Sequence, residues 1–455
     1  MVQVSSGRRS GGKHKVQAMQ LFLFLLILLM TVYVLVVACS FDSVFANKNT
    51  SILVLPHHDP SSGHELSQSQ QQPESAQSSI QSSKSRTVAF AVSVTGCGSD
   101  PITEGAAVLK YSIERASSRG NLGGTFDYEM FAIYHPSAEA CTLPLQDLGY
   151  KLLKRDVFVK VSDIKGDYLR DRIESNGCCG EKELIKLEAY TLTDYPIVVH
   201  LDLDVLILKP LDEIFNWMVD PPSSTPTSDS IMWPEKPWPS QINAFFTMDY
   251  NMVRPQTKYK PVQGGFLVLR PSMDVYKEFQ SIVLEGDFRA SGGWGGAVGP
   301  FYGSMTFQGI IPYYYNYLHT GQSVELSRCI YNQMADNPRT GRTVNDVLSG
   351  DCRTGTKECE DCRDRPIEDV VTTHFTLCQK PWLCGSHPQN QVQHRLCRKL
   401  TGAWYQIRSE MEAAWGRSGR GAGSYEQDLF HGFCKHHGKP GYFAIDRPYG
   451  SSKTE

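Results

Sequence analysis

The stretch Ile197-Val-Val-His-Leu-Asp-Leu-Asp-Val-Leu-Ile207 places two aspartates, Asp202 and Asp204, directly after an apolar run. The run over residues 197–201 predicts a buried β-strand. Residues i and i+2 share one face of a strand, so both carboxylates point to one place where it ends. Burying them unpaired is costly, and a divalent cation is a usual partner. The pair therefore predicts a magnesium or manganese site, with a solvated strand end as the alternative.

Strand-like and helix-like patterns alternate on both sides of this stretch. Apolar runs predict further strands at 88–94, 128–134, 157–161 and 265–270. Apolar residues at helical spacing predict helices at 105–116, 181–193, 211–218 and 273–284. Such alternation is typical of an α/β fold with a mostly parallel sheet and helices on both faces. In such folds ligands bind at the carboxyl ends of the strands, where the two aspartates lie.

The bulk composition bounds the size and the class of partner. The chain has 455 residues, which allows one large or two ordinary domains. Its net charge is -3, and 20% of its residues are charged. Because no strong basic excess is present, nucleic acid is not an expected partner. A hydrophobic content of 41% is enough for a substantial core.

The N-terminus predicts a membrane anchor. Residues 21–39 carry no charge, whereas Arg8, Arg9, Lys13 and Lys15 precede them. The positive-inside rule then predicts a cytoplasmic tail at 1–17, a transmembrane signal anchor at 18–39 and the rest of the chain across the membrane. Alternatives are a cleavable signal peptide and a bacterial lipoprotein box at 36–39.

The composition then divides the remainder of the chain. The serine- and glutamine-rich residues 40–86 predict a disordered stem, because such a segment buries too little apolar surface to order itself. The catalytic domain is expected at 87–398 and an accessory region at 399–455. Residues 221–261, rich in proline and serine, are expected to form a loop over the site.

Thirteen cysteines favour disulfides, as expected in an oxidising lumen. The spacing of Cys359 and Cys362 also allows a zinc site, although no matching second pair is apparent. Cys178 and Cys179 are adjacent, so each is expected to pair elsewhere rather than with the other. Disulfide connectivity stays open at this point.

Three other features have plain structural interpretations. The glycine cluster at 292–300 favours a flexible loop over a phosphate cradle, because no lysine-serine signature follows it. His200 is interpreted as lying on the other strand face from the aspartates and is expected in the core or an interface. The three tyrosines at 313–315 are expected in the core and in a pocket wall.

A late segment supplies the groups that a metal site still needs. The sequence from Thr372 to Trp382 holds His374 and Lys380. A neutral imidazole can complete a manganese shell, and a lysine is a point charge suited to phosphate. A metal beside a lysine is what a nucleoside-diphosphate leaving group requires.

Taken together, these motifs resemble the glycogenin-like retaining glycosyltransferases, glycosyltransferase family 8. The resemblance covers roughly residues 88–382, and its motifs occur in the family's order. They are the segments 186–195, 201–208, 211–215 and 263–272, the pair Gln308-Gly309, and His374 with Lys380-Pro-Trp382. The resemblance implies a GT-A (Rossmann-like) fold and transfer from a UDP-sugar with retained anomeric configuration.

The resemblance also implies roles for individual residues. It implies Mn²⁺, or Mg²⁺, on Asp202, Asp204 and His374, with Gln308 near the reacting face of the sugar. The nucleotide-sugar-binding residues that it implies are Lys186, Leu203, Gly264, Gly265, Gly309 and Lys380. The structural alternatives are a solvated helix residue for Lys186, a strand-end lining for Gln308, and backbone packing for the two adjacent glycines.

Three positions depart from the family pattern. Leu377 stands where the family has a late glycine, so the backbone near the diphosphate is expected to be held differently. Phe307 replaces the acid before Gln308, and Gln263 replaces the asparagine of the middle strand. The metal residues and the lysine are intact, so activity is expected to survive.

The expected function is manganese-dependent transfer of a hexose from a UDP-sugar to a glycan or glycoconjugate acceptor. With the predicted anchor, this places the chain in the Golgi membrane as a single-pass type II protein with a lumenal catalytic domain. The alternatives are a self-glucosylating enzyme like glycogenin and a catalytically silent sugar-binding or scaffold protein.

Overall fold

The computed structural model describes residues 86–98, 102–341, 348–383, 395–416 and Ile445. The predicted tail and anchor, and nearly all of the predicted stem, lie outside these residues. Among the described helices, none combines the length and the apolar character needed to cross a bilayer. The predicted anchor at 18–39 therefore stays a prediction.

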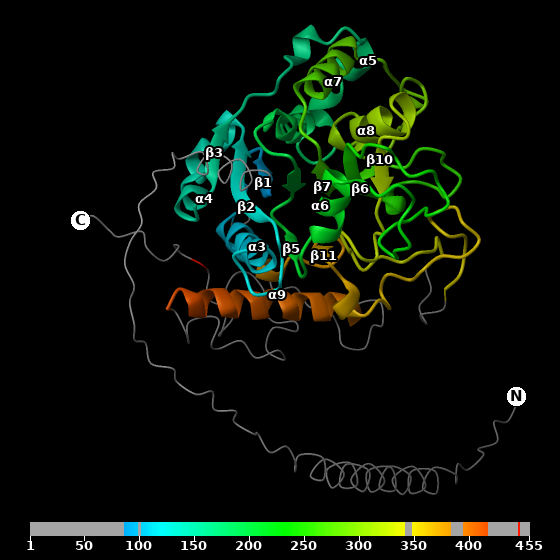
Figure 1. Cartoon of the computed structure of the whole chain (residues 1–455). Helices are drawn as coiled ribbons and strands as arrows, with labels where there is room; N and C mark the ends of the chain where they lie inside the picture. The colour runs from blue at the N-terminus through cyan, green and yellow to red at the C-terminus, as the bar shows by residue number, and fades with distance from the viewer. Residues whose placement is uncertain (1–85, 99–101, 342–347, 384–394, 417–444, 446–455) are drawn as a thin grey trace, which may run out of the picture. The chain divides into compact units, whose positions relative to one another are not determined.

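A seven-stranded sheet forms the centre of the described domain (Figure 1). Its order is β10-β6-β7-β4-β1-β2-β3, and β7 runs antiparallel to both of its neighbours. All other neighbours are parallel, so the predicted mostly parallel α/β sheet is confirmed. The strands are β1 (Thr87–Val94), β2 (Asp127–Tyr134), β3 (Lys151–Lys154), β4 (Val198–Leu201), β6 (Ala244–Met248), β7 (Val262–Leu269) and β10 (Ser323–Glu325).

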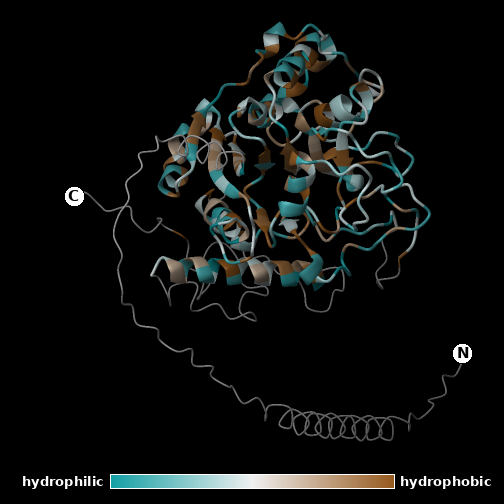
Figure 2. Ribbon diagram, in the orientation of Figure 1, coloured by the Kyte–Doolittle hydropathy of each residue, from teal (hydrophilic) through white to brown (hydrophobic). Residues whose placement is uncertain are grey.

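Helices cover both faces of the sheet because its central strands are apolar on both sides. In β1, Val88, Phe90 and Val92 enter one core, whereas Ala89 and Ala91 enter the other. Figure 2 shows the resulting apolar interior. The first core receives α3 (Ile102–Ala116), α6 (Asp212–Val219) and α9 (Arg395–Ala414). The second receives the 3₁₀ helix η4 (Gly180–Thr191), α7 (Met273–Glu285) and α8 (Phe307–Pro312).

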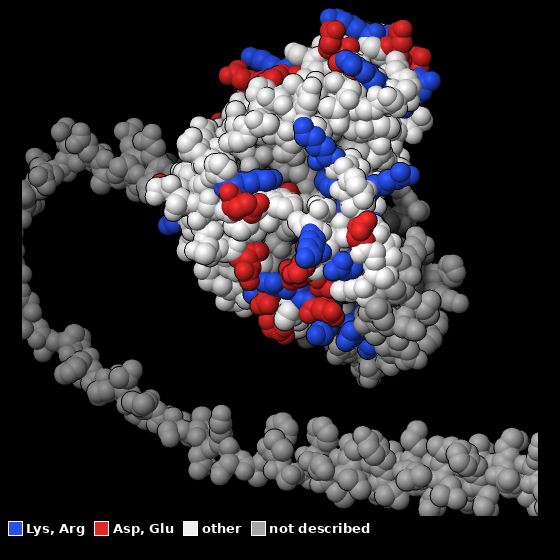
Figure 3. Space-filling model, turned by 90° about the vertical axis from the view of Figure 1, so that its right-hand side faces the viewer, with Lys and Arg blue, Asp and Glu red and all other residues white. Residues whose placement is uncertain are grey.

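Two small antiparallel pairs and several short turns complete the domain. β5 (Val205–Ile207) pairs with β11 (Thr372–His374), and β8 (Phe288–Arg289) pairs with β9 (Gly293–Trp294). The short helices are α4 (Leu143–Asp147) and α5 (Asp167–Arg170). The short 3₁₀ helices are η1 (Pro136–Cys141), η2 (Val161–Asp163), η3 (Ile173–Ser175), η5 (Tyr250–Met252), η7 (Ile367–Asp369) and η8 (Pro381–Leu383), and η6 (Tyr313–Leu318) is a π-helix. On the surface drawn in Figure 3, acidic and basic side chains are interspersed.

Three local predictions were wrong. The strand expected at 157–161 is absent, and β3 lies earlier, where its backbone pairs with the end of β2. The loop expected at 221–261 contains β6, whose residues are all buried. The glycine cluster is a tight hairpin rather than a flexible loop, because Trp294 is fully buried there and donates to the Ser304 carbonyl at 2.7 Å.

The helix α9 crosses the predicted boundary between residues 398 and 399. Its residues Leu400 and Trp404 are buried in the same core as α3, and Glu410 pairs with Arg115 of α3 at 3.1 Å. The helix α9 therefore packs on the core of the α/β domain, and the accessory region at 399–455 stays a prediction.

Four disulfides join described cysteines: Cys97–Cys141, Cys329–Cys362, Cys352–Cys359 and Cys378–Cys397. The prediction that disulfides prevail over a zinc site is confirmed for Cys359 and Cys362, which belong to different bridges. Cys178 and Cys179, expected to pair elsewhere, form no disulfide with any described cysteine.

Candidate metal centre

The two aspartates lie where β4 ends and β5 begins. The backbone N–H of Asp202 donates to Gly265 of the neighbouring strand β7 at 3.1 Å, and Val205 N–H donates to the Asp202 carbonyl at 3.2 Å. This short turn keeps both carboxylates at one end of the central strand. Asp202 is partly exposed, whereas Asp204 is buried.

The pairing of β5 with β11 brings His374 to the aspartates. His374 lies directly opposite Val205 in this ladder, and Phe375 N–H donates to the Asp204 carbonyl at 2.9 Å. The Nε2 atom of His374 is 3.1 Å from Asp204 Oδ1 and 4.0 Å from Asp202 Oδ2. The structure thus brings together three side chains whose ligand atoms all lie within 4.8 Å of one another.

A buried glutamine fixes the orientation of the imidazole. Gln263 Oε1 lies 3.1 Å from His374 Nδ1 and also accepts from the Gly265 N–H at 2.7 Å. Since a carbonyl oxygen only accepts, this contact assigns a proton to Nδ1 and leaves Nε2 for the acidic pair. Two carboxylates and an oriented imidazole fit Mn²⁺ or Mg²⁺ by the chemistry of the donor set. Gln263, which departs from the family pattern, has a defined role here.

The charges of the three groups depend on one another. Burial opposes ionisation of Asp204, but His374 and Lys380 beside it hold the pKa of its carboxyl well below the usual range. Burial would lower the pKa of His374, but the adjacent Asp204 raises it above its ordinary value. A proton on Nε2 is therefore stabilised by the neighbouring carboxylate.

Two lysines flank the acidic pair. Lys186, from η4, is buried and donates to Asp202 Oδ1 at 2.9 Å and to the Gly264 carbonyl at 3.2 Å. Burial disfavours its charge, yet Asp202 and Glu183 raise the pKa of its ammonium. Lys380 lies 3.2 Å from Asp204 Oδ2, and its side chain is 37% exposed. One lysine is thus held within the site, and the other stands at its border with solvent.

The glycines predicted at the site are places of close approach. A Cβ on Gly265 would lie 2.4 Å from Cε1 of His374, so a larger residue would displace the imidazole. A Cβ on Gly264 would lie 3.4 Å from Gln308 and 3.5 Å from Lys186. One on Gly309 would lie 1.9 Å from the Ser304 carbonyl, so that glycine serves backbone packing.

A cavity of about 460 Å³, the site pocket, opens over these groups. The predicted residues that line it are Asp202, Leu203, Asp204, His374, Lys186, Lys380, Gly264 and Gln308. Gly265 and Gly309 do not line it. Leu377 is 52% exposed on its wall, and Phe307 is fully buried beneath it.

The structural alternatives can be judged for two other features. His200 is fully buried, as expected, and bonded to Ser93 Oγ at 2.8 Å, and burial lowers its pKa to about 3. The expected opposite strand face is wrong, because residues i and i+2 share a face and His200 packs on Phe307, beside the Lys186 that bonds Asp202. Tyr314 and Tyr315 are buried in the core, as predicted. Tyr315 lines a different cavity.

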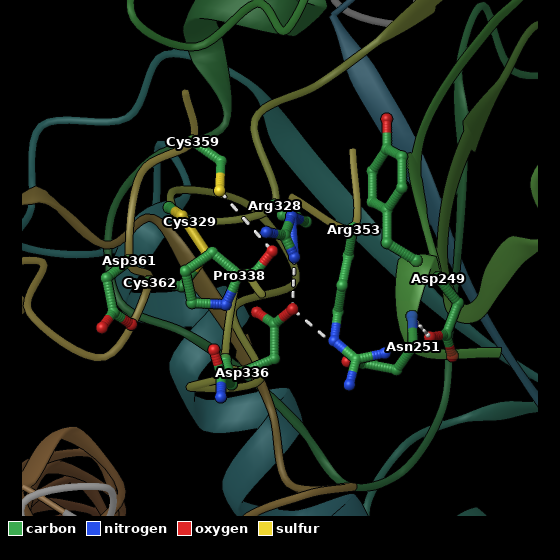
Figure 4. Close-up of polar contacts among 12 residues, drawn as sticks. Asp249, Asn251, Arg328, Cys329, Asp336, Pro338, Arg353, Cys359, Asp361 and Cys362 are labelled. Atoms are coloured by element: carbon green, nitrogen blue, oxygen red, sulfur yellow. Dashed lines mark hydrogen bonds and ion pairs between the residues drawn. A yellow bond between two sulfur atoms is a disulfide. The ribbon is translucent and has the colours of Figure 1, made fainter. Parts of the chain in front are cut away.

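A cluster that the sequence did not predict stands behind the pocket. Arg328 and Asp336 form a buried ion pair beside the Cys329–Cys362 disulfide (Figure 4). Asn251 donates to Asp336 Oδ2 at 3.3 Å and, like Asp249, lines the site pocket. Burial and the charge of Asp336 raise the pKa of Asp249 to about 6. Nothing in the local sequence indicates this cluster, because its members are far apart along the chain.

Comparisons with known proteins yield only distant structural likenesses. No protein-family model matches the chain, and no curated protein matches its sequence. Similar solved structures include apo mouse xyloside xylosyltransferase 1, with TM-score 0.40 and 13% identity, covering 65% of this chain and 99% of that one. Others are the galactosyltransferase LgtC (TM-score 0.35, 13% identity, 70% and 95%) and GlyE of Streptococcus pneumoniae (TM-score 0.37, 12% identity, 73% and 63%). Likenesses at these scores carry no argument about activity, which rests on the site itself.

Proposed function

We propose that this chain is a glycosyltransferase of the GT-A class that transfers a hexose from a UDP-sugar, with Mn²⁺ or Mg²⁺, to a glycan or glycoconjugate acceptor. The observation that supports the proposal most is the convergence of Asp202, Asp204 and His374 at one wall of the site pocket. Two lysines beside these groups add the positive charge that a diphosphate needs.

The cation and the lysines serve the same chemical requirement. Asp202, Asp204 and His374 would hold a divalent cation, which would supply positive charge to offset the negative charge of the leaving diphosphate. Lys380 contacts Asp204 and is also partly exposed to solvent, so its ammonium is available to a phosphate oxygen at the border of the site. Such contacts strengthen as charge grows on the leaving group, and they therefore favour the transition state over the bound donor.

The remaining residues hold the sugar and the acidic pair in place. Lys186 fixes Asp202 from the buried side, so that this carboxylate keeps one orientation. Gln308 lines the pocket beside Gly264, and its amide would orient the sugar or stabilise its positive charge. Because an amide is a poor nucleophile, retention of configuration is assigned to front-face attack by the acceptor hydroxyl.

The proposed compartment follows from the N-terminal sequence. Residues 1–39 predict a type II anchor, and the disulfides of the described domain suit an oxidising lumen. The proposal therefore includes a Golgi membrane protein whose catalytic domain faces the lumen.

The decisive experiment is UDP release by the purified chain from a panel of UDP-sugars. The expected result is release from one or a few donors, loss of release with EDTA, and recovery with Mn²⁺. A chain that binds Mn²⁺ yet releases UDP from no donor, with or without added glycans, would instead be the catalytically silent sugar-binding protein.

One observation favours a second candidate, self-glycosylation. Tyr302 lines the same pocket as Gln308 and is 57% exposed, so its side chain is accessible there. The three tyrosines at 313–315 do not line this pocket. Intact mass after incubation with the active UDP-sugar separates the candidates, since a hexose increment that Tyr302→Phe abolishes would establish self-glycosylation.

A further inference from the structure

Two adjacent thiols lie in the wall of the site pocket. Cys178 and Cys179 are the described cysteines outside the four disulfides, and their Sγ atoms are 2.6 Å apart. Cys178 is exposed and Cys179 is partly exposed, whereas the sulfurs of the Cys329–Cys362 bridge are buried. The pair is therefore accessible to reagents in solvent and close enough for its own sulfurs to react.

The turn that carries the pair is fixed on both sides by glycines. Gly177 and Gly180 have φ values of +67° and +61°, which side chains disfavour. A Cβ at Gly180 would also lie 2.3 Å from the Glu174 carbonyl. The sequence Gly177-Cys-Cys-Gly180 thus presents two neighbouring thiols on a defined turn at the start of η4.

This turn is tied to the elements that hold the proposed donor residues. Asn176 Oδ1 accepts from the Met305 N–H at 3.1 Å, and Glu183 Oε2 accepts from the Thr306 hydroxyl at 2.7 Å. Met305 and Thr306 directly precede α8, which carries Gln308. Cys178 and Cys179 line the same cavity as Lys186 and Gln308. A chemical change at the thiols therefore alters the wall that faces the ligand.

The two thiols differ in reactivity. The hydrogen bond from Cys178 lowers the pKa of the Cys179 thiol to about 6, whereas the same bond raises the pKa of Cys178. The direction of these shifts makes Cys179 the sulfur of the pair that ionises first. A thiolate that is accessible and adjacent to a second thiol is the arrangement that undergoes reversible oxidation.

We propose that Cys178 and Cys179 are a redox modification site, which forms a reversible vicinal disulfide in the wall of the site pocket and thereby sets the affinity for the donor. The statement about affinity rests on the proposed function, whereas the disulfide itself does not.

The oxidant is a disulfide of low molecular weight, such as oxidised glutathione. The Cys179 thiolate attacks one of its sulfurs, breaks the sulfur–sulfur bond and expels a thiolate, which leaves a mixed disulfide. Cys178 then loses its proton and attacks Sγ of Cys179, which expels the second thiolate. The two cysteines are oxidised, the small disulfide is reduced to two thiols, and excess reduced thiol reverses both steps.

Oxidation changes the charge that the donor meets. Both thiols line the pocket together with Glu183, and ionisation of the reduced pair there repels an anionic nucleoside diphosphate, whereas the vicinal disulfide cannot ionise. The oxidised chain is therefore expected to have a KM for UDP-sugar about 3- to 10-fold lower than the reduced chain, because a single charge in a partly exposed wall is incompletely screened. The expected change in kcat is small, since the thiols hold none of the proposed metal ligands.

Peptide mapping tests the bond itself in the full chain. Trypsin cleavage after Arg172 and Lys182 releases one peptide that contains both cysteines. After equilibration with oxidised glutathione and alkylation under denaturing conditions, this peptide is expected to be unlabelled and two hydrogens lighter than the dithiol. After mild reduction, both cysteines are expected to be labelled. Labelling of both despite oxidant, or a cross-link to the peptides of Cys384 or Cys434, would overturn the proposal.

Kinetics test the consequence for binding. KM and kcat are measured across ratios of reduced to oxidised glutathione, for the natural chain and for Cys178→Ser/Cys179→Ser. The natural chain is expected to shift in KM and the double variant to be insensitive, while mapping verifies that the four disulfides stay intact. A KM that is constant although mapping shows interconversion, or that shifts equally in the variant, overturns the link to affinity. Absence of all turnover overturns the proposed function instead, and mapping still decides the disulfide.

Discussion

Two cavities of the described domain differ in what lines them. The site pocket measures about 460 Å³ and is lined by Asp202, Asp204, His374 and two lysines. A second cavity, the aromatic cleft, measures about 640 Å³ and lies over β6 and β10. Its aromatic lining residues are Trp233, Trp238, Phe246, Tyr250, Tyr259 and Tyr315. The larger cavity is lined by Lys236, Lys258, Lys260 and Glu325, whereas the carboxylates and imidazole that could share a metal ion lie in the smaller one.

The carboxylates of the two cavities are used differently. In the aromatic cleft, the Glu325 carboxylate accepts hydrogen bonds from two neighbouring side chains, Trp233 Nε1 at 2.6 Å and the Tyr250 hydroxyl. In the site pocket, Asp202 and Asp204 face a common point together with His374. Volume alone therefore does not locate chemistry, whereas buried charges that share a target do.

Replacing one carboxylate in each cavity gives the largest contrast. Asp204→Asn removes an anionic ligand together with the partner of His374 and Lys380, so metal-dependent UDP release is expected to fall at least about 10³-fold. Glu325→Gln in the aromatic cleft is the matched variant and is expected to change turnover less than about twofold. Steady-state UDP release measures both, with thermal unfolding as the control for folding. Equal losses in the two variants would contradict the distinction between the cavities.

The second contrast concerns how the stability of the chain depends on pH through Asp249. Asp249 lines the site pocket, and its folded-state pKa is raised from 3.8 to about 6 by burial and by Asp336. The folded chain therefore binds the proton more tightly than the unfolded chain. Stability is expected to fall as pH rises from about 4 to 6, by on the order of 3 kcal/mol, and then to stay level.

Asp249→Asn is expected to abolish this loss, since the amide cannot ionise and can still accept from Asn251 N–H. Urea unfolding with EDTA at pH 4.5 and pH 7.5 measures it. The control is Asp220→Asn at an exposed acid, which is expected to keep the pH dependence of the natural chain. An unchanged profile for Asp249→Asn would show that this carboxyl is not the source.

The sequence predicted the core of the sheet because its strands are continuous apolar runs. The strands at 88–94, 128–134 and 197–201 correspond to β1, β2 and β4 within one residue at each end. The strand β6 was not predicted, because it has only five residues and lies within a segment rich in proline and serine. β10 and β11 have three residues each, too few to show a period.

The site was predictable only where its residues adjoin the central strand. Asp202 and Asp204 stand out locally, because carboxylates are unusual at the end of such a run. His374 is brought to them by the pairing of β5 with β11, which depends on contacts distant in sequence. The sequence offered His374 as a ligand by residue type and by its spacing to Lys380, and the family resemblance supported it. Gln263 appeared as a departure from the family, and its contact with His374 required the folded chain.

That contact gives the next contrast within the site pocket. Gln263→Ala removes the acceptor for His374 Nδ1 and for Gly265 N–H, so the imidazole loses its fixed orientation. Loss of such a partner is expected to weaken Mn²⁺ binding about 10- to 100-fold. Gln263→Glu keeps an acceptor and is expected to lose less. Calorimetric titration with Mn²⁺ measures both variants, and an unaltered affinity in Gln263→Ala would exclude this role.

The smallest effect is expected from a matched pair of lysines. Lys258 is exposed in the lining of the aromatic cleft, where its ammonium lies 4.8 Å from the Tyr259 ring centroid. An exposed cation–π contact of this kind contributes about 0.5–1 kcal/mol to stability, and it involves none of the proposed metal ligands. Lys258→Ala is expected to change the KM for UDP-sugar less than about twofold, whereas Lys380→Ala is expected to raise KM and lower kcat, because its ammonium stands beside Asp204. If Lys258→Ala raised KM tenfold while Lys380→Ala did not, the donor would bind in the aromatic cleft, and the converging charges of the site pocket would serve another purpose.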